Sequence, residues 1–208
     1  MPTNQFMNLK PEKRNLIIDS AVKEFAENGV LNASTNAIVK NCGISKGSLF
    51  KYFETKDEMC LDLFEIVTNE MLKDLSENIK DFSSDLFQKI IDYSVWETGW
   101  YIKNPLKGKF VIAVAKETDK DFVKKRDERF QKKSENVYEE VLSNVSADLF
   151  RVKKSAVAKI IKWVIEGYNQ EFLSKVDLTK SSINKLQKKY LHGLVSNIDV
   201  LKRGILYE

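Results

Sequence analysis

Residues 34–58, STNAIVKNCGISKGSLFKYFETKDE, decide the fold of this chain. Ser34 can cap a short helix that ends at Gly43, because glycine readily adopts the left-handed conformation that terminates helices. Ser45 can then cap a second short helix over residues 46–53. Two short helices joined by a turn that contains glycine are typical of a helix-turn-helix, whose second helix enters the major groove of DNA.

Longer helices are expected on both sides of this pair. Thr55, followed three residues later by Glu58, forms a capping box that opens a helix of about six turns. Upstream, Pro11 suits the first turn of a helix whose apolar positions stop at Gly29. Residues 1–9 are expected to form a loose arm.

Composition favours helices throughout. The chain has 208 residues, 43% of them hydrophobic, and only three prolines and eight glycines interrupt it. No segment alternates as a strand would, so the expected fold class is all-α. The longest apolar run, residues 110–115, is too short to span a membrane, and the start of the chain lacks the apolar core of a signal peptide. A cytoplasmic protein is therefore expected, in which Cys42 and Cys60 are reduced.

Charge changes sign along the chain. The formal net charge is +4, and residues 40–56 carry four lysines against one acidic residue. Residues 59–100 carry three lysines against nine acidic residues. This pattern fits a DNA-facing head joined to a different module, although two ordinary solvated faces would give the same pattern.

The run from Ile38 to Phe53, with Lys56 three residues further on, resembles the DNA-binding signature of TetR-type transcriptional repressors. Four upstream positions match the family's first helix and its end: Ile18, Ala21, Phe25 and Gly29. The resemblance covers roughly residues 13–60. It implies an N-terminal three-helix DNA-binding domain, residues 1–56, and a larger helical domain for effector binding and dimerisation, residues 57–208.

The resemblance also implies roles for individual residues of the helix-turn-helix. Candidate base-edge contacts are Lys46, Gly47, Phe50 and Lys51. Candidate phosphate contacts, which position the protein without reading sequence, are Thr35, Ser48, Tyr52 and Lys56. Phe50 departs from the tyrosine common at its position, so it can meet a thymine methyl group but has no hydroxyl to donate.

The second half is expected to contain helices over residues 85–103, 107–116, 119–144, 152–175 and 179–206. If it is an effector-binding body, aromatic rings can line a ligand site, and the candidates are Tyr93, Trp96, Trp100, Phe110 and Trp163. Aromatic residues at helical spacing also pack in ordinary cores, and this alternative stays open.

The last two long helices carry apolar stripes that could form a four-helix dimer interface with a second subunit. The candidate interface residues are Tyr168, Tyr190, Leu194, Ile198 and Leu201. The alternative is that these stripes pack inside one subunit. His192, the only histidine, has no cluster of ligands around it in the sequence and is expected at the interface or surface, so no metal site and no cofactor are predicted.

The expected function is a ligand-responsive DNA-binding transcriptional repressor, released from a near-palindromic operator by a small hydrophobic or aromatic effector. Its expected partners are operator DNA, a second copy of the chain and that effector, and no membrane. The alternative is an activator, or a DNA-binding regulator without an effector. An enzyme or small-molecule carrier is disfavoured, because the sequence has no GxSxG, P-loop, GxGxxG or HExxH motif and a single histidine.

Overall fold

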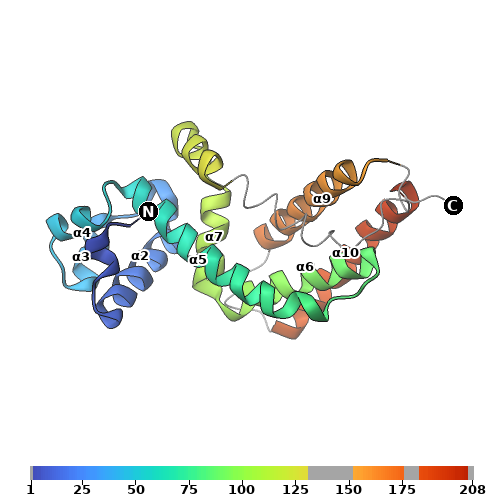
Figure 1. The fold of residues 1–208 in the computed structure, drawn as a ribbon, viewed down its shortest axis with the longest axis horizontal. Helices are drawn as coiled ribbons and strands as arrows, with labels where there is room; N and C mark the ends of the chain where they lie inside the picture. The colour runs from blue at the N-terminus through green and yellow to red at the C-terminus, as the bar shows by residue number, and fades with distance from the viewer. Residues whose placement is uncertain (1, 131–151, 176–182, 206–208) are drawn as a thin grey trace. The chain divides into compact units, whose positions relative to one another are not determined.

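The computed structural model describes residues 2–130, 152–175 and 183–205, and the regular structure in these ranges is helical (Figure 1). The all-α expectation is confirmed. The helices are α1 (Asn4–Met7), α2 (Pro11–Asn32), α3 (Thr35–Cys42), α4 (Lys46–Tyr52), α5 (Lys56–Asn78), α6 (Leu86–Lys103), α7 (Pro105–Ala115), α9 (Lys154–Ser174) and α10 (Ile183–Ile205). Residues 120–130 form a further helical segment, called helix 120–130 below. The expected continuation of that helix to residue 144, and a cap at Thr179, lie outside the described residues.

The chain divides into two compact units. The first comprises Met1–Lys73 with Asn104–Arg129, and the second comprises Asp74–Lys103 with Phe130–Glu208. By packing, α7 and the first part of α5 therefore belong with the helix-turn-helix. A functional division at residue 56 stays a prediction.

In the first unit, α2 packs along α7. The Phe110 ring of α7 is fully buried, and its centroid lies 6.0 Å from that of Phe25 on α2 and 6.5 Å from that of Phe64 on α5. Gly29 interrupts the helical geometry of α2 with φ of 75°, where the sequence predicted the end of that helix. Aromatic contacts thus join α7 to α2 and α5, the helices on either side of the predicted helix-turn-helix.

The start of the chain is not the loose arm that was expected. Residues 4–7 form α1, and Phe6 is fully buried. That expectation was wrong because Phe6 finds an apolar site against α4, which is distant in sequence, and burying an aromatic ring offsets the entropy lost on ordering a short segment.

The second unit is built on α6, α9 and α10, with α10 packed against both other helices. Its apolar core takes residues from all three helices: Leu86, Ile90, Val157, Ile161, Ile165, Leu186, Leu194 and Ile198. None of the helices in the described part of the chain is long and apolar enough to cross a membrane.

Candidate nucleic-acid interface

The helix-turn-helix is held in place by the caps that the sequence predicted. Ser34 Oγ accepts a hydrogen bond from the Ala37 amide at 3.3 Å, and Gly43 ends α3 in the left-handed conformation, with φ of 62°. Ser45 Oγ accepts from the Ser48 amide at 3.0 Å and so caps α4. The turn between α3 and α4 is thus set by a glycine and a serine only two residues apart.

Helix α4 turns one side inward and presents the other to solvent. Leu49, at its centre, is fully buried. The four candidate base-edge residues are all exposed, and their spacing places them on one outer face: Lys46, Gly47, Phe50 and Lys51. The structure therefore brings these candidates together on a surface that is open to a partner.

Gly47 is not required by the packing of the protein. A Cβ atom built there would have only one neighbour within 4 Å, Ser45 Oγ at 3.9 Å, and the backbone is helical. Glycine weakens a helix relative to alanine, so its position on the exposed face has no structural advantage within this chain. Close approach of another molecule to the α4 backbone is a role that glycine would suit.

The candidate phosphate contacts have varied surroundings. Thr35, Ser48 and Tyr52 are half-buried, and the Ser48 hydroxyl is hydrogen-bonded to the Ser45 hydroxyl at 2.9 Å. Lys56 Nζ donates to the Leu31 carbonyl at 2.6 Å and lies 3.5 Å from the Ala33 carbonyl. This contact, which the sequence did not predict, ties the start of α5 to the end of α2.

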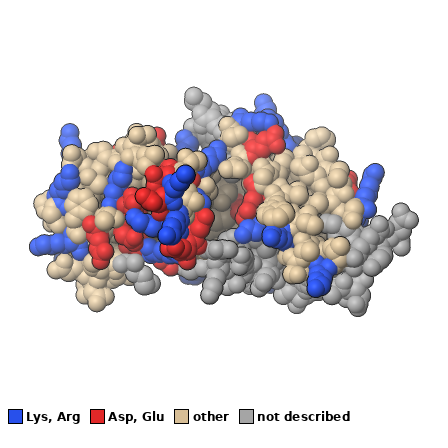
Figure 2. All heavy atoms as spheres, turned by 90° about the horizontal axis from the view of Figure 1, so that it is seen from above, with Lys and Arg blue, Asp and Glu red and all other residues tan. Residues whose placement is uncertain are grey.

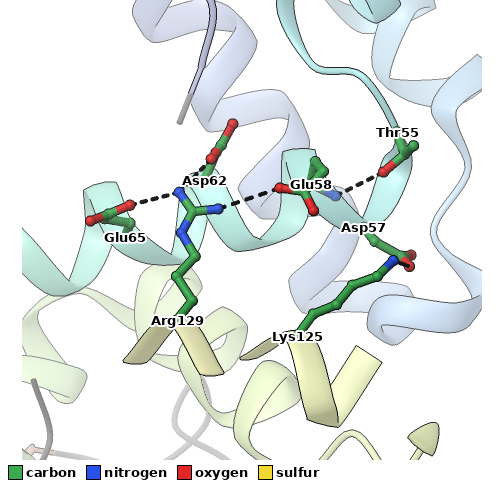
Figure 3. A network of polar contacts seen from close by, with 7 residues as sticks. All are labelled: Thr55, Asp57, Glu58, Asp62, Glu65, Lys125 and Arg129. Atoms are coloured by element: carbon green, nitrogen blue, oxygen red, sulfur yellow. Dashed lines mark hydrogen bonds and ion pairs between the residues drawn. The ribbon is translucent and has the colours of Figure 1, made fainter. Parts of the chain in front are cut away.

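A polar network holds helix 120–130 on α5 (Figure 3). Arg129 Nη2 donates to Asp62 Oδ1 at 2.5 Å and to Glu65 Oε2 at 2.6 Å, and Arg129 Nη1 lies 3.6 Å from Glu58 Oε2. The three carboxylates recur at helical spacing along one face of α5. That spacing is visible in the sequence, whereas the arginine that meets it comes from a distant segment.

Two further residues of the same helix hold it in place. Lys125 Nζ pairs with Asp57 Oδ2 at 3.1 Å, and Arg126 Nη1 donates to the Val114 and Ala115 carbonyls, at 2.9 and 3.1 Å, at the end of α7. On the face shown in Figure 2, acidic and basic side chains are interleaved over helix 120–130. This surface has no single sign of charge, unlike a surface built to attract nucleic acid.

The predicted ligand-site aromatics do not form one group. Tyr93 and Trp96 lie together in the second unit, with ring centroids 5.6 Å apart, and Trp96 Nε1 donates to Asp74 Oδ2 at 2.6 Å. Trp100 is also buried there. Phe110 is part of the first unit's core, and Trp163 is 61% exposed. Their roles toward a ligand stay predictions.

Sequence reasoning missed a polar chain inside the second unit. Asn169 Nδ2 donates to Glu97 Oε2, and Tyr190 Oη donates to Asn169 Oδ1, each at 2.5 Å. Burial raises the pKa of the Glu97 carboxyl to about 7, although the Asn169 hydrogen bond acts in the opposite direction. The signal in the sequence was a lone acidic residue, Glu97, within the aromatic stretch of α6.

Most of the predicted dimer residues are covered within one subunit. Tyr190, Leu194 and Ile198 are at most 2% exposed, and Tyr168 and Leu201 are half-buried. This matches the alternative in which the apolar stripe of α10 packs inside the subunit. His192 is exposed. A role in dimerisation stays a prediction.

The capped α3–turn–α4 unit and the exposed face of α4 define a helix-turn-helix, the motif whose second helix enters the major groove in DNA-binding proteins. Residues 17–63 match the family described as bacterial regulatory proteins, tetR family. This N-terminal part of the chain is thus similar to the DNA-binding segment of TetR-type transcriptional regulators.

Two relatives from Bacillus subtilis (strain 168) are similar to the N-terminal part. The fatty acid metabolism regulator protein is 32% identical over 75 residues, which are 36% of this chain and 39% of that protein. The uncharacterized HTH-type transcriptional regulator YuxN is 42% identical over 52 residues, which are 25% of this chain and 18% of that protein. The chain thus spans less than half the length of each of these curated relatives.

Solved structures resemble the whole fold. A TetR family transcriptional regulator from Chloroflexus aurantiacus J-10-FL has a TM-score of 0.67 at 20% identity, with both chains covered completely. FadR from Bacillus subtilis, in complex with stearoyl-CoA, has a TM-score of 0.67 at 19% identity over 88% of this chain and 98% of that one. At these identities the likeness concerns the fold.

Proposed function

We propose that this chain is a transcriptional repressor that binds a near-palindromic operator as a homodimer and is released by a small hydrophobic or aromatic effector. The observation that carries the proposal is the exposed face of α4, where two lysines and a glycine stand together at the helix that the family uses to read DNA. A two-fold dimer would present two such helices to the two half-sites of an operator.

On this proposal, the residues of α4 have different tasks. Lys46 and Lys51 donate to guanine O6 and N7 or to phosphate, and Phe50, which is 38% exposed, meets a thymine methyl group. Gly47 allows the helix backbone to approach the floor of the groove. Tyr52 contacts phosphate and fixes the register of the helix.

The effector is proposed to bind the second unit, whose helices are rich in aromatic and aliphatic residues. The Bacillus subtilis FadR whose fold this chain shares was solved with stearoyl-CoA. Long-chain acyl-CoA is therefore the first class of compound to test here. The N-terminal similarity to the fatty acid metabolism regulator gives no support for the effector itself, because it covers only 36% of this chain.

Release would follow from a shift between DNA-competent and DNA-incompetent conformations of the dimer. Helix α5 runs from the helix-turn-helix into the second unit, and α7 packs on α2 through Phe110 and Phe25. Either helix could carry a change in the second unit to the α4 surface. An effector acts only if its affinity differs between the two conformations.

Selection from random duplexes at moderate salt tests the proposal. We expect a near-palindromic site, bound by two copies of the chain. Lys46→Ala should relax the preference at specific base pairs, and Lys13→Ala, an exposed substitution outside the helix-turn-helix, is the matched control. Failure to enrich any site would overturn DNA reading. Enrichment without release by acyl-CoA or aromatic compounds would favour a regulator that needs no such effector.

A further inference from the structure

We propose that Thr3 and Phe6 are positioning residues for the DNA-reading helix, so that the N-terminal segment, residues 2–9, sets operator affinity and specificity. This inference rests on the proposed function, since it concerns how α4 is presented to DNA. It assigns a role to a part of the chain that lies outside residues 17–63, the region matched by the family.

The first observation concerns the end of α4. The last carbonyl groups of a helix have no partners within the helix and are commonly satisfied by a glycine turn. Here α4 is followed by Phe53 in an extended conformation. Thr3 fills this role instead: its amide donates to the Tyr52 carbonyl at 3.2 Å, and its hydroxyl donates to the Lys51 carbonyl at 3.0 Å. The recognition helix is therefore capped from outside the helix-turn-helix.

The second observation concerns the ring of Phe6. It is fully buried, and its centroid lies 4.8 Å from that of Phe53 and 5.8 Å from that of Tyr52. Tyr52 is a candidate phosphate contact that is only half-buried, so a neighbouring ring restricts the directions that its side chain can take. Phe6 thus packs against Phe53, which directly follows α4, and against Tyr52, a candidate DNA contact at the end of α4.

The segment is itself anchored at its other end. Arg14 Nη1 on α2 donates to the Met7 carbonyl at 2.9 Å, directly after Phe6. The segment therefore links the start of α2 with the end of α4. With Ser45 capping its first turn, α4 is held at both ends.

Such support matters because α4 has only seven residues. Helices this short are unstable without tertiary contacts. Base-edge hydrogen bonds also require donors held within about 0.5 Å of their correct positions. A loosened end of α4 would therefore reduce specific contacts more than the general attraction between lysines and phosphates, which depends on charge.

The test compares Thr3→Val with Thr3→Ser in the full chain. Valine has a similar shape but removes the hydroxyl donor, whereas serine keeps it. Dissociation constants are measured for the selected operator and for a scrambled duplex at the same salt. We expect Thr3→Val to weaken operator binding about 3- to 10-fold, the range that corresponds to one hydrogen bond. Scrambled-duplex binding should stay unchanged, and Thr3→Ser should bind as the wild type does.

Phe6→Ala should have a larger effect, on the order of 30-fold, and Phe6→Leu should restore most of the affinity, because a buried aliphatic side chain replaces much of the lost contact. A purely structural role would lower the affinity for both duplexes together. The ratio of operator affinity to scrambled-duplex affinity therefore distinguishes the two roles: a positioning role lowers this ratio, and a purely structural role leaves it unchanged.

Unchanged ratios in folded Thr3→Val and Phe6→Ala proteins would overturn the inference, and if Phe6→Ala fails to fold, the Thr3 pair decides. If the wild type prefers no site, the proposed function fails separately. In that case amide hydrogen exchange of α4 in the free protein tests the part of the inference that does not depend on DNA, the capping of α4 by Thr3. Faster exchange in Thr3→Val than in Thr3→Ser would support it, and equal rates would overturn it.

Discussion

The guanidinium of Arg129 meets the carboxylate of Asp62 at 2.5 Å, and the Asp62 side chain is only 3% exposed. The two residues lie 67 positions apart in the sequence. Asp62 is thus a carboxylate on the inner side of α5 whose charge is compensated by an arginine from helix 120–130. Loss of that arginine would remove the cation that faces this buried carboxylate, and removing one member of a buried ion pair is costly.

Arg129→Gln should therefore lower the free energy of unfolding by about 3 kcal/mol, the lower end of the range for removing one partner of a buried ion pair. Lys125→Gln is the matched control on the same helix. Its pair with Asp57 is 45% and 37% exposed, so its loss should cost at most about 0.5 kcal/mol. Urea denaturation measures both. Equal losses would show that burial does not distinguish the two pairs.

Gly47→Ala should separate stability from DNA binding. The helical backbone and open space at Gly47 predict a gain of about 0.5–1 kcal/mol in stability, together with weaker operator binding if DNA approaches the backbone there. Gly43→Ala is the opposite case, because φ of 62° should make it destabilising by about 1 kcal/mol. Thermal unfolding and operator titration give the two readouts. Undiminished operator affinity in Gly47→Ala would contradict close approach.

Substitutions of Lys51 and Lys56 should differ in their effects on the stability of the protein. Lys51 is exposed, so Lys51→Ala should leave stability unchanged and reduce the salt slope of DNA binding by about one if it contacts phosphate. Lys56→Ala removes donors to the Leu31 and Ala33 carbonyls and should cost about 1 kcal/mol in stability. Denaturation curves measure the stability of both variants, and binding isotherms at several salt concentrations give the salt slopes of DNA binding. A stable Lys56→Ala protein would place the role of Lys56 entirely with DNA.

Glu97 should make stability depend on pH. Burial raises the pKa of its carboxyl from an ordinary 4.5 to about 7, so between these values the folded state holds a proton that the unfolded state has lost. The free energy of unfolding should therefore fall as pH rises from 4.5 to 7, by about 2–3 kcal/mol, and this contribution should be constant above that range. Glu97→Gln should remove the fall, whereas the exposed Glu171→Gln should keep it. An identical pH profile for wild type and Glu97→Gln would refute the prediction.

Leu194→Asp should unfold the second unit and not merely separate subunits. Leu194 is fully buried within the chain, and an unpaired charge there costs several kcal/mol, about the whole stability of a small domain. Val200→Asp, at a position that is 71% exposed on the same helix, should keep the fold. Circular dichroism and sedimentation report on folding and association. A folded Leu194→Asp monomer would instead assign Leu194 to a dimer interface.

Local chemistry explains what the sequence could predict. Ser34, Ser45 and Thr55 announce helix starts because their hydroxyls bond amides three residues later, and the structure shows all three bonds. These helix starts, together with helical spacing, also predicted which side of α4 is exposed. Contacts over long sequence separations left no comparable signal. Nothing near Phe6 indicates α4 as its partner, and nothing near Lys56 indicates that it donates to the carbonyls of Leu31, in α2, and Ala33, directly after α2.

The apolar face of α10 shows a second limit of prediction from the sequence. Its periodicity predicted burial but could not tell a neighbouring helix from a second subunit, since both are apolar surfaces. The structure covers Leu194 and Ile198 within one chain. Likewise, the sequence marked the aromatic residues of the second half as candidates for a ligand site. It could not distinguish Phe110, which lies in the core of the first unit, from Trp163, which is exposed.

All three tryptophans of the chain, Trp96, Trp100 and Trp163, lie in the second unit, and the helix-turn-helix contains none. Tryptophan fluorescence therefore reports from the second unit alone. Trp163, 61% exposed, should be open to aqueous quenchers, whereas Trp100, 7% exposed, should be shielded from them. Binding of the proposed effector to the second unit can therefore be followed without labels, while labelled DNA reports separately on the proposed contacts of α4.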